Sequence, residues 1–203
     1  TCMGALLDVP GHVVVTGNGL TEVGSRYPDN ESAIVRFVEV LQEAGMNARA
    51  SDNVDGVVWT KAIVNCGINP VGALTGLTNG EVYRNRALRQ VVIRLVNEAA
   101  AVAKALGIRL TTDDPIRYTL GTAKATANNV NSMLRDFRRG KRTEIDYLTG
   151  VVLELGEQLG IDMPVSETVY ALVKGLEASL MQPRVSSVEF ISPLELAQII
   201  TAP

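Results

Sequence analysis

Aromatic side chains are scarce in this sequence, as are the residues that bind metals or form disulfides. Only 4% of the 203 residues are aromatic, whereas 46% are hydrophobic. A chain of this length and composition can bury a sizeable core, as one large domain or as one domain with part of another, so general disorder is excluded. The low aromatic content, together with abundant Ala, Val and Leu, argues against an aromatic-rich β-sandwich and favours closely packed helices.

Cysteine and histidine together account for only three positions. Cys2 and Cys66 are far apart and no secretory leader is recognisable, which favours free thiols in a reducing cytoplasm. Cys66 lies in an apolar run, where a thiol is usually a small packed side chain. The one histidine, His12, has no second histidine or acidic partner at metal-ligand spacing. We therefore predict a cytoplasmic protein without a metal site.

Long runs of charge and long apolar runs are also missing. The formal net charge is −3, and the densest basic stretch is "RDFRRGKR" (135–142). That stretch is more typical of a solvated helix end than of a nucleic-acid-binding surface. No apolar run approaches the roughly 20 residues that are needed to span a bilayer. Neither nucleic acid nor a membrane is therefore expected as a partner.

The first quarter of the chain combines strand signals with one helix. The β-branched run "HVVVT" (12–16) is followed, across a Gly-Asn-Gly turn, by "LTEVGS" (20–25), which predicts two strands joined as a hairpin. Asp29 or Asn30 can cap a helix that runs to about Ala44. A short extended piece, "MNARASDN" (46–53), then precedes the helical part.

After Asn53 the apolar residues recur at spacings of three and four, which is typical of helices. The expected helices are Val54–Gly67, which Pro70 either ends or kinks within a longer helix, Val82 or Asn85 to Leu106, Thr112 to about Asn128 or Asn129, Asn131–Arg139, Thr143–Gly160, Pro164 to about Leu180, and a short one after Pro193. The sequence therefore predicts a mainly α protein with a helical body, residues 53–203, after a small α/β segment, residues 1–52.

The stretch "WTKAIVNCGINPVGALTG" (59–76) carries polar residues at a regular interval on an otherwise apolar helix. Lys61, Asn65 and Asn69 follow one another every four residues, so they lie on nearly the same helix face. Neighbours such as Ile63 and Val64 should belong to the core. The stripe is either the wet side of an amphipathic helix or a binding surface. Amides favour the second because they donate and accept at fixed angles, whereas solvated faces usually mix Glu, Lys and Arg.

Three other polar residues have ordinary structural interpretations when each is taken alone. Ser132 in "NNVNSML" could be a small hydroxyl in a helix, and Glu144 in "RTEIDY" could support a helix amino end. Asn79 in "LTNGE" precedes glycine, a pair that is typical of turns. The sequence holds no Gly-x-Ser-x-Gly elbow, phosphate loop or dinucleotide glycine fingerprint.

Taken together, these segments resemble a known family. "WTKAIVNCGINPVGALTGLTNGE" (59–81) and "NNVNSMLRDFRRGKRTEIDYLTG" (128–150) resemble the C-terminal half of ketopantoate reductase, also called 2-dehydropantoate 2-reductase. That family shows a W-x-K-x-x-x-N-x-x-x-N pattern, then S-M-x-x-D and T-E-I-D-Y-x-x-G. The opening "TCMGALLDVPGHVVVTGNGLTEVG" (1–24) is similar to the end of its nucleotide-binding domain. The resemblance spans nearly the whole chain and is weakest past about Leu180.

The resemblance implies a particular fold and domain division. Residues 53–203 would form an all-helical substrate-binding and catalytic domain of the phosphogluconate-dehydrogenase-like type. Residues 1–52 would be the C-terminal remnant of a Rossmann domain whose glycine-rich phosphate loop lies upstream. The chain also starts at Thr1, within a strand-rich segment. We therefore expect a trimmed or fragmentary polypeptide that is inactive alone.

The resemblance also implies an activity: reduction of ketopantoate to pantoate with NADPH, on the pathway to pantothenate and coenzyme A. Hydride addition builds negative charge on the ketone oxygen, which requires a positioned acid. Lys61 matches the family's proton donor, and we expect Trp59 and Ile63 to half-bury it. Further matches are substrate-binding residues Asn65, Asn69, Asn79 and Ser132, and cofactor-side residues Glu144 and Ala5.

Two alternatives stay open at this point. A related 2-keto acid dehydrogenase of the same superfamily would keep the helical domain and the cofactor but take another substrate. A noncatalytic helical module would only dimerise or bind a partner, and the missing nucleotide loop favours it. Because the same apolar helices can pack within or between chains, a homodimer is also open.

Overall fold

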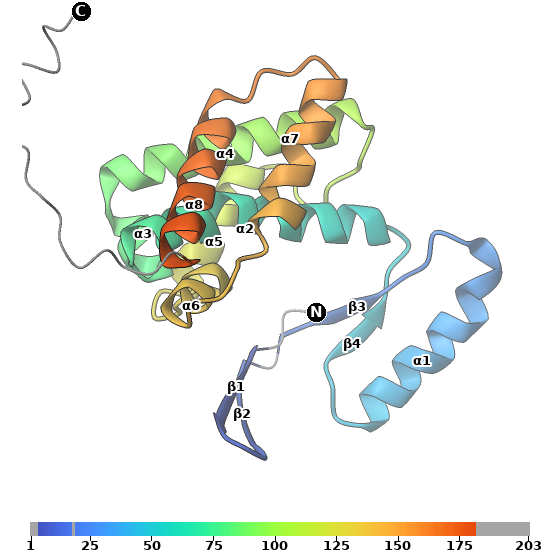
Figure 1. Cartoon of the computed structure of the whole chain (residues 1–203). Coiled ribbons are helices and arrows are strands. Elements are labelled where there is room, and N and C mark those ends of the chain that lie inside the picture. Colours follow the sequence, from blue (N-terminus) through green and yellow to red (C-terminus); the bar gives the residue numbers. More distant parts are fainter. Residues whose placement is uncertain (1–3, 18, 182–203) are drawn as a thin grey trace, which may run out of the picture.

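The computed structural model describes residues 4–17 and 19–181 (Figure 1). A small α/β part comes first along the chain, and a larger helical part follows from Val54. The predicted fold class, mainly α with a small α/β segment at the amino end, is confirmed. Cys2 and the helix predicted after Pro193 lie outside the described residues.

The α/β part consists of two separate two-stranded sheets and one α-helix. Its elements are β1 (Gly4–Val9), β2 (His12–Gly17), β3 (Thr21–Val23), the 3-10 helix η1 (Pro28–Asn30), α1 (Glu31–Glu43) and β4 (Ala48–Ala50). Strands β1 and β2 pair antiparallel, whereas β3 and β4 pair parallel. Gln42 of α1 donates a hydrogen bond from Nε2 to the carbonyl of Ala48 at 2.8 Å, which ties this helix to β4.

The predicted hairpin between residues 12–16 and 20–25 is wrong. Strand β2 pairs instead with the preceding β1, and Val9 faces His12 across the turn. Gly11 in that turn has a φ of 87°, which a side-chain-bearing residue rarely adopts. Strand β3 pairs with β4 only after the chain has crossed over through α1, because parallel strands need such a connection.

The helical part has seven α-helices among the described residues. Its elements are α2 (Val54–Thr75), α3 (Asn79–Arg84), α4 (Arg86–Ala105), α5 (Pro115–Ala125), α6 (Ser132–Arg138), the 3-10 helix η2 (Ile145–Tyr147), α7 (Thr149–Gln158) and α8 (Pro164–Met181). No described helix is both long and apolar enough to cross a membrane.

For α2 one of the two expected alternatives is confirmed, whereas two other helices differ from those expected. Helix α2 continues through Pro70, so the longer of the two alternatives holds. Helix α5 ends at Ala125 because the next residues turn toward α3, where the amides of Asn79 and Gly80 donate to the carbonyls of residues 129 and 127. The helix expected from Thr143 to Gly160 is divided into η2 and α7, because the backbone of Leu148 leaves the helical region at φ −108° and ψ −89°.

Helix α2 occupies the middle of the helical part and contacts α3, α4, α5, α6 and α8. Several of its buried side chains, with Ile63 among them, join those of α4 in the largest core cluster. Gly67 allows the close approach of these two helices: a Cβ added there would lie 2.7 Å from Cγ2 of Val96. The amino end of α2 is held by Asn53, which accepts from the Gly56 amide at 3.2 Å and donates to the Arg109 carbonyl at 2.7 Å.

This close packing gives a test by paired glycine substitutions. We expect Gly67→Ala to lower the free energy of unfolding by about 1–3 kcal/mol, because the added methyl overpacks the contact with Val96. Gly121→Ala in α5 meets no atom within 4 Å and should raise it by up to about 1 kcal/mol through helix propensity. Urea denaturation of both variants measures the difference. Equal effects would contradict the packing described at Gly67.

Candidate functional site

The polar stripe on α2 runs from solvent into the protein interior. Lys61 is exposed, Asn65 is half-buried, and Asn69, with 6% of its surface exposed, is buried. Ile63 is buried and Trp59 is half-buried, but Lys61 itself is exposed, so the expectation that these two residues would half-bury Lys61 is wrong. Because its inner end is buried, the stripe is not simply the wet face of an amphipathic helix.

The buried end of the stripe is connected to two residues that are distant in sequence. Asn69 Nδ2 donates to Ser132 Oγ at 3.4 Å, and Ser132 Oγ donates to Glu144 Oε1 at 3.0 Å. Ser132 is the first residue of α6, and Glu144 directly precedes η2. Three of the predicted site residues are therefore linked by hydrogen bonds, although 63 and 12 residues separate the pairs.

A glycine and a helix cap explain how Ser132 comes so close to α2. Asn131 caps α6 by accepting from the Leu134 amide at 2.9 Å. The same side chain packs directly on Gly72 of α2, where an added Cβ would collide with Asn131 Nδ2. The absence of a side chain at Gly72 thus lets the amino end of α6 rest on α2 beside Asn69.

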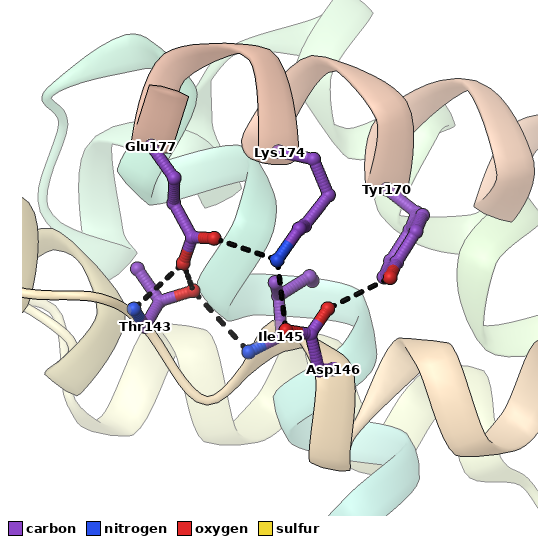
Figure 2. Close-up of polar contacts among 6 residues, drawn as sticks. All are labelled: Thr143, Ile145, Asp146, Tyr170, Lys174 and Glu177. Carbon is purple, nitrogen blue, oxygen red and sulfur yellow. Dashed lines mark hydrogen bonds and ion pairs between the residues drawn. The ribbon is translucent and has the colours of Figure 1, made fainter. Parts of the chain in front are cut away.

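The loop that carries Glu144 is held by helix α8 (Figure 2). Both the backbone amide and the hydroxyl of Thr143 donate to Glu177 Oε1, each at 2.7 Å. The Ile145 amide in turn donates to Thr143 Oγ1 at 3.2 Å. Glu177 is buried, with 5% of its surface exposed. Its burial alone would raise the pKa of this carboxyl, but the bonds from Thr143 and Lys174 outweigh burial and lower the pKa.

A second set of contacts holds the next residue of the loop, Asp146 (Figure 2). Lys174 Nζ lies 2.7 Å from Asp146 Oδ2 and 2.9 Å from Glu177 Oε2, and Tyr170 Oη donates to Asp146 Oδ1 at 2.7 Å. The hydrogen bonds from Lys174 and then from Tyr170 lower the pKa of Asp146. The hydrogen bonds to Asp146 and then to Glu177 raise the pKa of Lys174.

These residues of α8 are not among the predicted site residues, although the sequence contains a signal for them. Tyr170, Lys174 and Glu177 follow one another at spacings of four and three, so they share one helix face, as the stripe on α2 does. Figure 2 shows all three side chains directed from α8 toward the loop. The same sequence signal therefore marks α2 and α8: polar residues on one face of an otherwise apolar helix.

Asn79 and Ala5 are not joined to this hydrogen-bonded group. Asn79 is the first residue of α3 rather than a turn residue, because Thr78 caps the helix through a capping box with Glu81. Its Nδ2 donates to Thr126 Oγ1 at 2.9 Å, while its buried Oδ1 has no hydrogen-bond partner. Ala5 lies in β1, in the α/β part of the chain, and is exposed.

The arrangement can bind a polar organic molecule through hydrogen bonds, with a lysine at its open end. Asn69 and Ser132 provide amide and hydroxyl groups, and Glu144 provides an exposed carboxylate. Within residues 4–17 and 19–181, no group of three or more His, Cys, Asp and Glu side chains could hold a metal ion. The amide, hydroxyl, carboxylate and ammonium groups of these side chains support hydrogen bonding and proton transfer.

Comparison with known proteins places the chain in a family context. Residues 53–177 match the family model described as ketopantoate reductase PanE/ApbA C terminal. A 2-dehydropantoate 2-reductase from Archaeoglobus fulgidus is 38% identical over 180 residues, which cover 89% of this chain and 60% of the relative. The chain thus spans about three fifths of that relative's length.

Solved structures share the fold. A PanE/ApbA family ketopantoate reductase from Ralstonia eutropha JMP134 superposes with a TM-score of 0.81 at 31% identity, covering 89% of this chain and 58% of that one. A D-mandelate dehydrogenase solved with NADH and anilino(oxo)acetate gives a TM-score of 0.80 at 27% identity, covering 88% and 59%.

Cys66, next to the stripe on α2, is expected to be inert. The thiol is buried, with 3% of its surface exposed, and burial raises its pKa to about 11. At pH 8 only about one thiol in a thousand would be the reactive thiolate. In a Cys2→Ser variant we expect a disulfide reagent to label no thiol in the folded protein and one thiol in denaturant. Rapid labelling of the folded variant at pH 8 would contradict the burial of Cys66.

Proposed function

Because the chain belongs to the ketopantoate reductase family, we propose that it forms the substrate-binding part of an NADPH-dependent 2-dehydropantoate 2-reductase. The reaction would reduce the ketone of ketopantoate to the alcohol of pantoate, in pantothenate and coenzyme A biosynthesis in the cytoplasm. In this proposal residues 53–203 are the catalytic helical domain and residues 1–52 are the end of the nucleotide-binding domain.

The observation that carries the proposal is the hydrogen-bonded chain from Asn69 through Ser132 to Glu144. These residues come from α2, from the start of α6 and from the loop before η2. Nothing in their sequence positions requires them to meet, and yet each has the residue type that a keto acid or a nucleotide would bind. Neutral amide and hydroxyl groups can hold a carboxylate and a hydroxyl without placing another charge near the lysine.

Lys61 is the proton donor in the proposed reaction. When bound, the reduced nicotinamide supplies the hydride to the ketone carbon. Lys61 gives a proton to the ketone oxygen, on which negative charge develops. Asn65 and Asn69 continue the stripe inward and would orient the substrate relative to that lysine. Since Lys61 is exposed, it can be reprotonated from water after each turnover.

Glu144 fits a role on the cofactor side of the site. Its carboxylate is fixed on one oxygen by Ser132, and the side chain is exposed, so the hydroxyl of a bound nucleotide can reach it. A carboxylate is a strong acceptor for such a hydroxyl. Because this chain spans about three fifths of the Archaeoglobus fulgidus relative, we propose that the phosphates are bound by residues of the family's nucleotide-binding domain that this chain does not contain. Ala5 would lie near the nicotinamide in that complete site.

A second candidate is a related 2-keto acid dehydrogenase with the same cofactor chemistry. The likeness to a D-mandelate dehydrogenase favours it, because that protein shares the fold at 27% identity. The two candidates differ in the side chain of the keto acid. In either candidate the lysine, amides and hydroxyl of this chain would act in the same way, so only a comparison of substrates separates them.

The test measures the oxidation of NADPH and of NADH by a polypeptide that joins this chain to the family's nucleotide-binding domain. We expect activity with ketopantoate and NADPH, and a fall in kcat of about 10²- to 10⁴-fold in Lys61→Ala, because general acid catalysis is lost. Lys104→Ala removes an exposed lysine near the end of α4 and serves as the matched control, with kcat unchanged.

Two results would overturn parts of the proposal. Full turnover by Lys61→Ala would remove this residue from the chemistry. Turnover of an aryl keto acid but not of ketopantoate would replace the reductase by the second candidate. Residues 1–203 alone are expected to oxidise neither nucleotide.

A further inference from the structure

We propose that Glu177 and Lys174 of α8 are positioning residues, which hold the loop of residues 143–147 so that Glu144 meets Ser132. The role of Glu144 in this inference rests on the proposed function. The ordering of the loop itself does not, because it follows from the contacts among the described residues.

The first step is the double contact between Thr143 and Glu177. One carboxylate oxygen accepts both the backbone amide and the hydroxyl of Thr143, each at 2.7 Å, which fixes the backbone and the side-chain rotamer of that residue together. The Thr143 hydroxyl then accepts the amide of Ile145 at 3.2 Å. Glu144 lies between these two residues, so the backbone is held at the residue before it and at the residue after it.

The second step is that Asp146 and Ile145 hold the loop from the other side. Lys174 of α8 binds Asp146 of the loop at 2.7 Å, and within α8 it also binds Glu177 at 2.9 Å, the residue that holds Thr143 (Figure 2). The side chain of Ile145 is fully buried in the cluster that contains Met133 of α6. The loop is therefore joined to α8 by polar contacts and to α6 by an apolar contact as well.

The Glu144 side chain makes none of these contacts with α8. Glu144 is exposed, although the residues on both sides of it are buried. An exposed carboxylate on a free loop would lose conformational entropy each time it bound a partner. On a loop that is already fixed, most of that loss has occurred on folding, and the carboxylate is ready beside Ser132 at 3.0 Å.

The contacts of the buried Glu177 carboxylate indicate that this residue positions the loop of residues 143–147 and does not only stabilise the fold. Apolar replacements of buried ion pairs are often neutral or even stabilising, so burial of charge alone gives little reason for this arrangement. The oxygens of Glu177 instead select one conformation of Thr143 and one position of Lys174. An apolar residue at position 177 could fill the same space but could not specify the loop.

The test uses graded substitutions at two positions and measures amide hydrogen exchange at residues 143 and 145. Glu177→Met removes the acceptor, and we expect local exchange to rise about ten- to a hundredfold, because a hydrogen bond to a charged group is lost. Glu177→Gln keeps one acceptor oxygen, so amide exchange at residues 143 and 145 should rise less in this variant. Glu167→Met makes the same change at an exposed position of α8 and is the control, with exchange at the loop unchanged.

Thr143 provides an independent pair. Thr143→Val preserves the shape and the backbone amide but removes the hydroxyl, so the exchange of the Ile145 amide should rise, whereas Thr143→Ser should stay close to wild type. Nuclear magnetic resonance then measures the contact between Ser132 and Glu144 directly. In the wild type, Glu144→Gln should shift the carbon resonances of Ser132; in the Glu177→Met background it should no longer do so, because the two side chains have already separated.

The last measurement is the activity of the polypeptide that joins this chain to the family's nucleotide-binding domain. We expect Glu177→Met and Glu144→Ala to lower kcat/KM non-additively, since both remove the same placed carboxylate. Unchanged exchange in Glu177→Met, or a Ser132 shift that persists there, would overturn the inference, and so would fully additive losses. If no keto acid is reduced at all, the proposed function fails, while exchange and the Ser132 resonances still decide whether α8 positions Glu144.

Discussion

The helical part depends on the burial of α2 among its neighbours, because a helix in that place must give every polar group it carries a partner. Thr60, which is buried, accepts from the Thr111 amide at 2.9 Å, and Asn69 donates to Ser132. Unpaired polar groups in such positions would cost more than the bonds themselves contribute. The polar residues of α2 therefore restrict which segments can lie beside this helix. Gly67 and Gly72 allow those segments to approach it closely.

Much of this could be predicted from the sequence, because helices and stripes are local features. The spacing of Lys61, Asn65 and Asn69 placed them on one face, and Gly45, Gly107 and Gly140 end their segments with positive φ as such residues commonly do. The direction of the stripe was not predictable. Its passage from exposed to buried depends on which helices cover α2, and that is a tertiary property.

The wrong hairpin and the missed network have the same physical origin. Both are pairings between segments that local patterns leave undetermined. Strand β3 has only three residues, and its partner β4 comes after α1. Local sequence patterns therefore favour pairing of β3 with the nearer strand β2. Glu177 is 34 residues from Thr143. In the sequence alone its carboxylate resembles any charged residue on a helix surface, because its role depends on the packing of α8 against the loop.

The open and closed ends of the stripe suit different tasks in the proposed reaction. Proton exchange with water needs the exposure that Lys61 has, whereas hydrogen bonds that orient a substrate are stronger where water is excluded, as it is at Asn69. Glu144 combines the two conditions in one residue: an exposed carboxylate on a backbone that is held from the interior. A site of this kind can admit its ligands from solvent and still present its groups in a fixed geometry, because the ordering lies in the supporting residues rather than in those that bind.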